Sequence, residues 1–438
     1  MEKFLTVTID DLDMNANGIA HKNEKTIFVD GALKDEQVEC EIIKEKQNLI
    51  FAKNTKIIKS SPFRINPLCP YFSECGGCDI QHLKYEKGLE FKKNQIKIAF
   101  KKIANIILPD FEIESSQNQY HYRNKIALKI CEINGEKILC YYKKNSHNPL
   151  KISNCVIANE KFKFVIENVN KFLKTNNLAV YDEKTKQGEF KHLVARIIDN
   201  NLMLTFVLKN NKSLQKIEEL QQILLTSFNK VGININVNKN NKEILSNKFI
   251  NLVGNNTINF ENLNIKQKIS NASFLQVNTL VANKIYSYVL KNVSEIVVNA
   301  YSGAGLLSAI IAKNSPKNQV FGIEINKIAT RMANDLKLEN SIENLANFCG
   351  DAGKILDKLN LKDFDLIVDP PKSGMDSKML NAIKKFLPKK LIYISCDKIS
   401  LAKNINQLKY NYLIKQIKAF DMFPQTKNVE TVVILERI

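Results

Sequence analysis

The sequence of 438 residues lacks an apolar run long enough to cross a membrane. LLSAIIA at 306–312 is among its longest apolar stretches, whereas a membrane-spanning helix needs about 20 residues. The first ten residues, MEKFLTVTID, carry charges where a secretory signal peptide has its apolar core. We therefore expect a cytoplasmic protein that does not contact a membrane.

The sequence is also short of acidic residues relative to basic ones. It has 64 Lys and Arg residues against 45 Asp and Glu residues, which gives a formal net charge of +19. A lysine-rich surface accounts for part of this excess, but a polyanionic partner accounts for it better, and we expect nucleic acid. With 44% hydrophobic residues the chain can form more than one core, and its length suits roughly two to four domains.

Cysteines are few and unevenly spaced. CPYFSECGGC places Cys69, Cys75 and Cys78 in a C-x5-C-x2-C pattern. Disulfides are rare in a reducing cytoplasm, so we interpret this pattern as part of a metal site. A closed thiolate site has four ligands, for zinc or for an iron–sulfur cluster, and the absence of paired C-x2-C knuckles favours iron–sulfur. Four cysteines elsewhere are interpreted as ordinary packing residues: Cys40, Cys131, Cys140 and Cys349.

The rhythm of apolar residues changes along the chain. Residues 1–58 alternate apolar and polar positions in short runs, which is typical of a small β-barrel of the OB type. A basic amphipathic helix is predicted over 88–103, and 119–270 mix strands with helices, including a hairpin that turns at 199–201. From about 271, seven strand-like runs appear, and helical patterns separate the first six. This alternation predicts a doubly wound α/β sheet with helices on both faces.

Small and acidic residues follow the strands of this predicted sheet. Gly303 and Gly305 form a turn that opens a helix, but the pattern is not G-x-G-x-x-G, which argues against a dinucleotide. Glu324, Asp351 and Asp369 end the next three strands. Carboxylates at successive strand ends suit a nucleoside without phosphates, such as S-adenosylmethionine.

Cys396 follows the fifth strand of this sheet, just before a predicted helix, and helix N-termini lower the pKa of a thiol. The chain has five histidines, at 21, 82, 121, 147 and 192, so none lies in this region. A base acting here would be a carboxylate, and Glu430 is the candidate. Addition of a thiolate to C6 of a uracil makes C5 nucleophilic towards a methyl donor, and a base then removes the C5 proton.

At these residues the sequence resembles the RNA (uracil-5-)-methyltransferase family, and most closely its branch that methylates 23S rRNA and carries an iron–sulfur cluster. The resemblance covers essentially the whole chain. Its most specific motifs are DPPKSGM, YISCDKISLAKN and DMFPQTKNVE, supported by DLDMNANGIAH, CPYFSECGGCDIQHLKY, YRNKIALKI, FLQVN and YSGAG. It implies that Cys396 is the nucleophile and Glu430 the base.

The resemblance also implies the ligands. S-adenosylmethionine would contact the following residues: Gln276, Tyr301, Glu324, Asp351 and Asp369. A [4Fe–4S] cluster would bind to Cys69, Cys75, Cys78 and, as the distant fourth ligand, Cys155 in LKISNCVIAN. A cluster closed by four cysteines has no open iron, so we expect it to serve structure or RNA contact.

The implied fold has three parts. Residues 1–59 would form an OB-like TRAM domain that binds RNA, and residues 60–80 with 113–269 an α+β central domain with the iron–sulfur site. Residues 81–112 with 270–438 would form a Rossmann-like class I S-adenosylmethionine-dependent methyltransferase domain. The expected product is 5-methyluridine in large-subunit ribosomal RNA, and we expect a monomer.

The sequence departs from the family pattern at a few positions. Asn299 stands where an acid is usual, Asn428 where a histidine is common two residues before the base, and Asp397-Lys398 where Asn-Pro follows the nucleophile. Ala16 replaces a customary glycine in the TRAM segment. None of these changes removes the nucleophile or the base, so we expect an active enzyme.

Several alternatives stay open at the level of sequence. The methylated RNA could be the tRNA T-loop instead of rRNA. DPP after the fourth strand resembles the motif of adenine amino-methylating enzymes, which need no cysteine, and cytosine-C5 enzymes often have a second cysteine where Lys372 stands here. A radical enzyme would need an open iron, and a decayed enzyme that only binds RNA would not need both Cys396 and Glu430.

Overall fold

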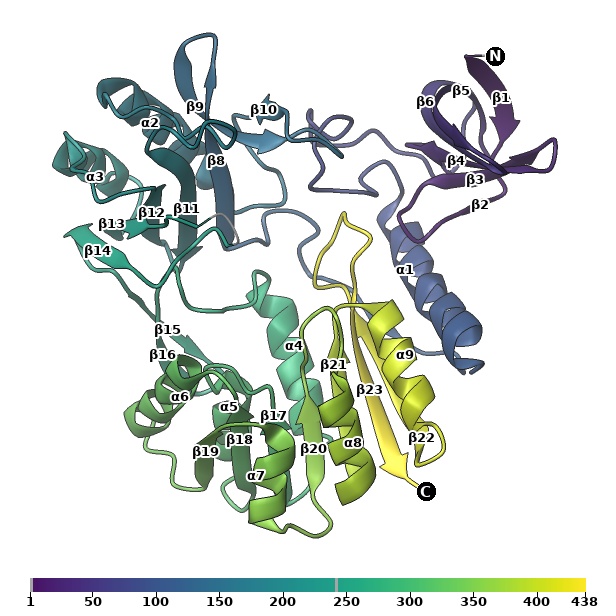
Figure 1. Ribbon diagram of the computed structural model, residues 1–438, viewed down its shortest axis with the longest axis vertical. Coiled ribbons are helices and arrows are strands. Elements are labelled where there is room, and N and C mark those ends of the chain that lie inside the picture. The colour runs from purple at the N-terminus through teal and green to yellow at the C-terminus, as the bar shows by residue number, and fades with distance from the viewer. Residues whose placement is uncertain (1–2, 241–242) are drawn as a thin grey trace.

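The computed structural model describes residues 3–240 and 243–438, which form three large sheets and a two-stranded hairpin. Figure 1 shows the N-terminal sheet (purple) and the central sheet (blue to teal) side by side above the C-terminal sheet (green to yellow). Within the described residues, no helix is both long and apolar enough to span a membrane.

The N-terminal sheet has six strands in the order β1-β5-β6-β4-β3-β2. Buried and exposed residues alternate along β1 and the first part of β6, as the sequence predicts for strands that cover one core. Ala16, the residue that replaces a customary glycine, has φ 63°, a left-handed conformation that glycine adopts more easily. The strands are β1 (Phe4–Thr8), β2 (Asp11–Leu12), β3 (Gly18–Lys22), β4 (Lys25–Asp30), β5 (Gln37–Lys46) and β6 (Leu49–Lys59).

A basic helix joins this sheet to the rest of the molecule. The predicted helix is present as α1 (Tyr85–Ala99), and one turn of π-helix, η1 (Phe100–Ala104), continues it. Phe91 on α1 packs in an apolar cluster with Leu12 and Leu33 of the N-terminal domain. The fully buried Glu36 carboxylate also accepts hydrogen bonds from the Arg64 guanidinium, at 2.5 and 2.7 Å. These bonds hold the segment between β6 and α1 against the N-terminal sheet.

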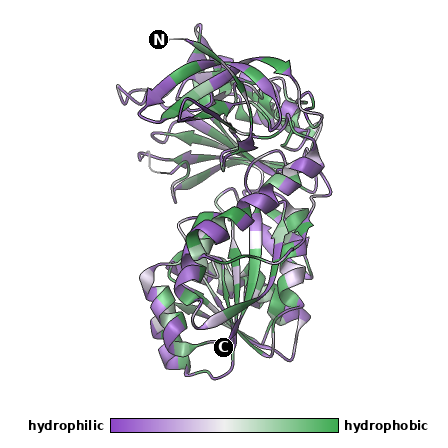
Figure 2. Cartoon of the chain, turned by 90° about the vertical axis from the view of Figure 1, so that its right-hand side faces the viewer, coloured by the Kyte–Doolittle hydropathy of each residue, from purple (hydrophilic) through white to green (hydrophobic). Residues whose placement is uncertain are grey.

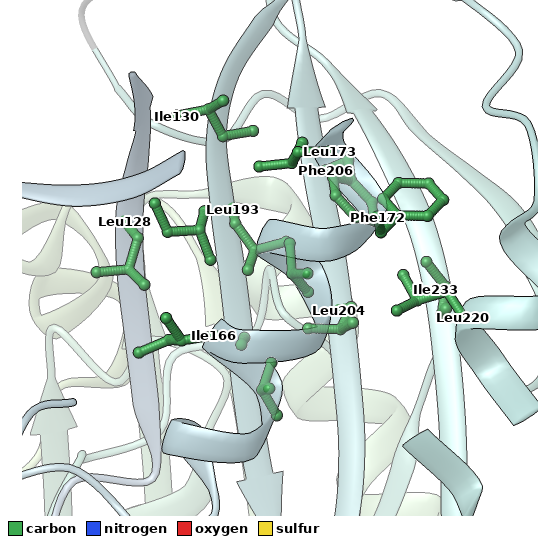
Figure 3. Close-up of a cluster of buried hydrophobic side chains, with 14 of the residues drawn as sticks. Leu128, Ile130, Ile166, Phe172, Leu173, Leu193, Leu204, Phe206, Leu220 and Ile233 are labelled. Carbon is green, nitrogen blue, oxygen red and sulfur yellow. The ribbon is translucent and has the colours of Figure 1, made fainter. Parts of the chain in front are cut away.

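The central sheet has seven strands in the order β10-β9-β8-β11-β12-β13-β14. Figure 3 shows side chains of α2 and α3 packed onto one face of it, with Phe172 and Leu173 of α2 against Phe206 of β12. The predicted hairpin turns at Asp199 and Asn200, which both have positive φ. The elements are β8 (Lys125–Ile133), β9 (Glu136–Tyr142), β10 (Pro149–Lys151), α2 (Phe162–Thr175), β11 (Phe190–Ile198), β12 (Asn201–Leu208), α3 (Ile217–Leu225), β13 (Lys230–Val237) and β14 (Phe249–Val253).

Three of the four cysteines interpreted as packing residues do not behave as such. Cys131 on β8 and Cys140 on β9 form a disulfide, because the antiparallel register brings them to diagonal positions on paired strands. Cys349 is exposed at the end of β19 (Leu345–Cys349). Only Cys40 is a buried packing residue, as predicted.

The C-terminal sheet has eight strands in the order β19-β18-β17-β20-β21-β23-β22-β7, and its parallel part confirms the predicted doubly wound α/β fold. Apolar clusters cover both faces, since Val298 of β17 packs in one and Val297 in the other. Figure 2 shows the apolar strands in the middle and polar surfaces on the flanking helices. The elements are α4 (Thr279–Leu290), β17 (Ile296–Ala300), α5 (Leu306–Asn314), β18 (Gln319–Glu324), α6 (Lys327–Glu339), β19, α7 (Ala352–Leu359), β20 (Asp365–Val368), α8 (Ser377–Phe386), β21 (Lys390–Ser395), α9 (Lys398–Leu408), β22 (Tyr412–Phe420) and β23 (Glu430–Arg437).

Two short elements cross the predicted domain limits. β7 (Ile113–Glu114) pairs with β22, so the C-terminal sheet takes two residues beyond the stretch 81–112. The hairpin of β15 (Ile258–Asn262) and β16 (Ile265–Ile269), which falls in the predicted central domain, places Ile265 in the core of the C-terminal domain.

Candidate active site

The predicted site residues gather at the carboxyl edge of the C-terminal sheet. β17 lies between β18 and β20 and is parallel to both, so the order of strands reverses between β17 and β20. Ligands of doubly wound sheets bind outside the strand ends at such a reversal. In Figure 1 the antiparallel β23 points down, so the carboxyl ends of the parallel strands point up towards the other two sheets.

A strained turn leads from β17 into α5. Tyr301, Gly303 and Gly305 have φ values of 60°, 54° and 82°. A Cβ on Gly305 would lie 2.6 Å from the Cβ of Ala333 on α6, so the close approach of α6 requires glycine there. A Cβ on Gly303 would meet no atom within 4 Å, so the turn leaves open space above that residue.

Glu324 ends β18 beside this turn. Its Oε2 accepts a hydrogen bond from the Gly303 N–H at 2.9 Å, and its Oε1 accepts one from the Asn326 N–H at 2.7 Å. Two backbone donors therefore fix the carboxylate at the edge of the sheet. Burial raises the pKa of the neighbouring Tyr301 phenol to about 12.

The other three predicted cofactor contacts differ in their surroundings. Asp351 caps α7, and its Oδ1 accepts from the Lys354 N–H at 3.1 Å. Asp369 directly follows β20; its side chain is open to solvent, yet protein atoms surround it densely, and this desolvation raises its pKa to about 7. Gln276 is half-buried two residues before Asn278, which caps α4.

The register of β23 brings Cys396 and Glu430 together. Ser395, the last residue of β21, is paired with Thr431 across the antiparallel β21–β23 ladder. Cys396 and Glu430 are the next residues outward, so they lie opposite one another at the edge. The Glu430 side chain is only 5% exposed, whereas Cys396 is partly accessible.

Burial and neighbouring carboxylates raise the pKa values of Cys396 and Glu430. Burial, followed by the carboxylates of Glu430, Asp369 and Asp397, raises the pKa of Cys396 to about 11. Burial and the nearby Asp369 raise the pKa of Glu430 to about 8. The sequence-based prediction of a lowered thiol pKa is therefore wrong, because desolvation and three carboxylates outweigh the N-terminus of α9.

The residues that depart from the family pattern differ in their burial and hydrogen bonds. Asn299 lies inside β17, 2% exposed, where its amide donates to the Ser308 hydroxyl at 2.9 Å, so it does not reach the open edge. Asp397 caps α9 and accepts from the Ile399 and Ser400 N–H groups at 3.1 and 2.8 Å. Asn428 is exposed.

Tyr286, on the helix α4, is not among the residues predicted from the sequence. Burial raises the pKa of this phenol, and the charges of Asp369 and Glu430 raise it further, so it lies close to both carboxylates. Its only signal in the sequence is an aromatic residue in an apolar helix, which is ordinary for a core position.

The four cysteines predicted as metal ligands line one cavity of about 500 Å³ beside the central sheet. Cys69, Cys78 and Cys155 contact the apolar cluster around Tyr122. Burial, with a smaller contribution from the charges of the other three sulfurs, raises the pKa of Cys78 to about 12, so all four sulfurs are close to one another. Of the residues the structure describes, however, no group of His, Cys, Asp or Glu converges tightly enough to hold a single metal ion.

Comparison with known proteins identifies the family. The family model described as tRNA (uracil-5-)-methyltransferase matches residues 84–438, and that of the TRAM domain matches residues 3–54. An uncharacterized RNA methyltransferase from Clostridium acetobutylicum is 32% identical over 447 residues, covering 99% of this chain and 96% of that protein. One from Caldanaerobacter subterraneus is 32% identical over 444 residues, covering 99% and 98%.

The fold also has a solved counterpart. The crystal structure of the tRNA (uracil-54, C5)-methyltransferase of Pyrococcus abyssi, in complex with S-adenosyl-L-homocysteine, has a TM-score of 0.79 and 24% identity, and covers 98% of this chain and 100% of that one. This likeness confirms the predicted methyltransferase fold. The two family matches and the relatives show that the chain belongs to the tRNA (uracil-5-)-methyltransferase family and is an RNA (uracil-C5) methyltransferase with an N-terminal TRAM domain.

Proposed function

We propose that this enzyme methylates C5 of a uridine in large-subunit ribosomal RNA, with S-adenosylmethionine as the methyl donor and Cys396 and Glu430 as the catalytic pair. The observation that carries the proposal is the placement of these two side chains opposite one another at the carboxyl edge, because β23 enters the sheet antiparallel to β21. A thiol and a buried carboxyl in contact with one open edge suit addition to a pyrimidine followed by proton removal.

We assign the addition step to Cys396 and the proton removal to Glu430. The Cys396 thiolate adds to C6 of the uracil, and the C5–C6 π electrons move onto the ring as an enolate. C5 then takes the methyl group from the donor, whose sulfur keeps the bonding electrons. Glu430 removes the proton from C5, the C5–C6 double bond forms again, and the Sγ–C6 bond breaks to return the thiolate.

The methyl donor fits the residues at the open turn. Glu324 is fixed by two backbone N–H groups, one of them from Gly303, where an added Cβ would meet no atom within 4 Å. A fixed carboxylate beside such open space suits a ribose diol. We assign further contacts to Gln276, Tyr301 and Asp369. Asp351, whose Oδ1 caps α7, is assigned as a further contact.

The pair of roles is tested by the step that each variant blocks. Cys396→Ala should abolish methyl transfer, because without addition C5 is not nucleophilic. Glu430→Gln should still add and methylate but should not release the product, so protein covalently bound to methylated RNA accumulates on a denaturing gel. Normal turnover by Glu430→Gln, or adduct formation with 5-fluorouridine RNA by Cys396→Ala, would contradict these roles.

The RNA target is tested by mapping. We infer 23S rRNA from the cysteine segment and the TRAM domain, which together mark the rRNA branch that the sequence resembles. The tRNA T-loop is the second candidate, because the solved counterpart acts on tRNA uracil 54. 5-Methyluridine should disappear from rRNA, and not from tRNA, in a strain that lacks this gene, and the opposite pattern would select the second candidate.

We also propose that the cysteine cavity holds a [4Fe–4S] cluster on Cys69, Cys75, Cys78 and Cys155. The support is that the four thiols line one cavity, where a cationic cluster core would stabilise them as thiolates. Protein purified without oxygen should be brown and contain about four irons per chain. Cys155→Ser should lose iron as Cys78→Ser does, while the exposed Cys349→Ser should not, and a colourless zinc protein would contradict the cluster.

A further inference from the structure

The segment that delivers Glu430 to the site is residues 421–429, which we call the base connection because it joins β22 to β23. Figure 1 shows it in yellow, rising from the edge of the C-terminal sheet towards the other two domains. Most of it is buried, with Asp421 and Met422 both 0% exposed. Its position therefore depends on the residues that hold it.

α1 holds the start of the base connection. The buried Lys92 ammonium donates to Asp421 Oδ1 at 2.5 Å and to the Phe423 carbonyl at 3.0 Å. The Tyr85 hydroxyl donates to Asp421 Oδ2 at 2.8 Å. Both carboxylate oxygens of Asp421 are therefore fixed to one helix.

The residue after the third clustered cysteine holds the end of the base connection. The N–H groups of Asp79 and Ile80 both donate to the Gln425 carbonyl, at 3.1 and 3.2 Å. The Asp79 carboxylate in turn accepts from the Lys427 N–H, with Oδ2 at 3.0 Å, and lies 3.5 Å from the Lys427 ammonium. Nearby, the buried Tyr122 hydroxyl donates to the Pro424 carbonyl at 3.1 Å.

We propose that Asp79, with Tyr122, positions Glu430 for proton removal. Asp79 contacts the base connection at the Gln425 carbonyl and at the Lys427 N–H. Lys427 lies three residues before Glu430. A catalytic group displaced by about 1 Å can lose about 100-fold in rate, so an anchor at this distance matters. Because Asp79 directly follows Cys78, its contacts also hold the cysteine segment against the base connection. The inference rests on the proposed role of Glu430.

The proposal predicts a defect in one step of the reaction. Addition and methyl transfer use Cys396, which lies in the turn between β21 and α9 and not in the base connection. A displaced Glu430 would therefore leave the formation of the covalent adduct intact and slow its breakdown. A merely structural role would lower both steps together.

The experiment follows the adduct in a single turnover with labelled RNA on a denaturing gel. Asp79→Ala should lengthen the lifetime of the adduct about 10-fold or more, with its rate of formation close to wild type. Asp79→Asn should restore most of the release, since the amide oxygen still accepts from the Lys427 N–H. Tyr122→Phe, which removes one hydroxyl and no charge, should lengthen the lifetime about threefold and serves if Asp79→Ala does not fold.

The matched control is Asp110→Ala. Asp110 also pairs with two lysines, Lys93 and Lys97, but it is exposed and does not touch the base connection, so its variant should release RNA as wild type does. Release at the wild-type rate by both Asp79→Ala and Tyr122→Phe would overturn the proposal. Slowed formation of the adduct without slowed release would overturn it too.

Glu430→Gln is measured in parallel. If its adduct accumulates while those of Asp79→Ala and Tyr122→Phe do not, only the positioning role fails. If the Glu430→Gln adduct does not accumulate, the role of Glu430 as the base fails, and the positioning role fails with it.

Discussion

Glu430 must lose a proton to act as a base, yet its site favours the protonated form. Burial and the Asp369 carboxylate raise its pKa to about 8, from an ordinary value near 4.5. Cys396, with its pKa raised to about 11, is likewise held in its protonated form at neutral pH. A methyl donor with a positive sulfonium would favour the ionised forms of both groups.

The raised pKa of Glu430 makes stability depend on pH. Below about pH 4.5 the carboxyl is protonated in both the folded and the unfolded chain. As pH rises from 4.5 to 8, the unfolded chain releases the proton and the folded chain keeps it, so the free energy of unfolding falls. Glu430→Gln removes this loss and should raise the free energy of unfolding by about 4 kcal/mol at pH 8 and by less than about 1 kcal/mol at pH 5.

Urea unfolding of the C-terminal domain at the two pH values checks this expectation. Glu436→Gln is the matched control, because Glu436 is also on β23 but its side chain is 46% exposed. Its effect should be small at both pH values. Equal effects of Glu430→Gln at pH 5 and pH 8 would show that the carboxyl is not held protonated.

The single residues show how far the sequence could be read. Cys396 and Glu430 could be predicted because each lies in a specific motif next to a strand. The pKa of the thiol was predicted in the wrong direction, because the carboxylates that raise it come from β20 and β23 as well as from Asp397. Tyr286 was missed because its neighbours, Asp369 and Glu430, are far from it in the sequence.

At the scale of elements, the turn between β17 and α5 carries two glycines with different duties. Both have positive φ, but only Gly305 faces another element, since a Cβ there would lie 2.6 Å from Ala333 Cβ. Gly303 faces open space at the proposed site of the methyl donor. Gly305 permits packing, and Gly303 leaves room for a ligand.

Two alanine variants separate these duties. Gly305→Ala should lower the free energy of unfolding by about 3 kcal/mol, from backbone strain and the clash with α6 together. Gly303→Ala should lower it by about 1 kcal/mol, from strain alone, but should weaken binding of S-adenosylhomocysteine. Urea unfolding and calorimetric titration measure the two effects. Equal loss of stability in both variants would contradict the assignment.

Elements also mark what sequence patterns could and could not give. Each apolar run predicted as a strand in the C-terminal domain is a strand, because burial on both faces leaves a continuous apolar signal. The same signal cannot tell that β23 inserts between β21 and β22, and this order alone sets Glu430 opposite Cys396. The disulfide of Cys131 and Cys140 was missed for the same reason, since it depends on the register of two strands.

At the scale of the molecule, three domains meet around one edge. α1 packs against the N-terminal domain through Phe91 and against the base connection through Lys92, so one helix joins the TRAM domain to the base connection. Lys427, in the base connection, also donates to Asn15 of the N-terminal domain at 3.2 Å. An RNA at the carboxyl edge would therefore meet a surface built from all three domains.

The charge of +19 makes the strength of that encounter depend on salt. Lysines that neutralise RNA phosphates release bound counterions, so the logarithm of the binding constant falls linearly with the logarithm of salt concentration. For about five contacts to single-stranded phosphates, the Kd should rise about 100-fold between 50 and 200 mM KCl. Fluorescence anisotropy with a labelled rRNA fragment measures it. Affinity for S-adenosylhomocysteine, which has no phosphate, should change little over the same range, and equally flat RNA binding would mean that the lysines only solvate the surface.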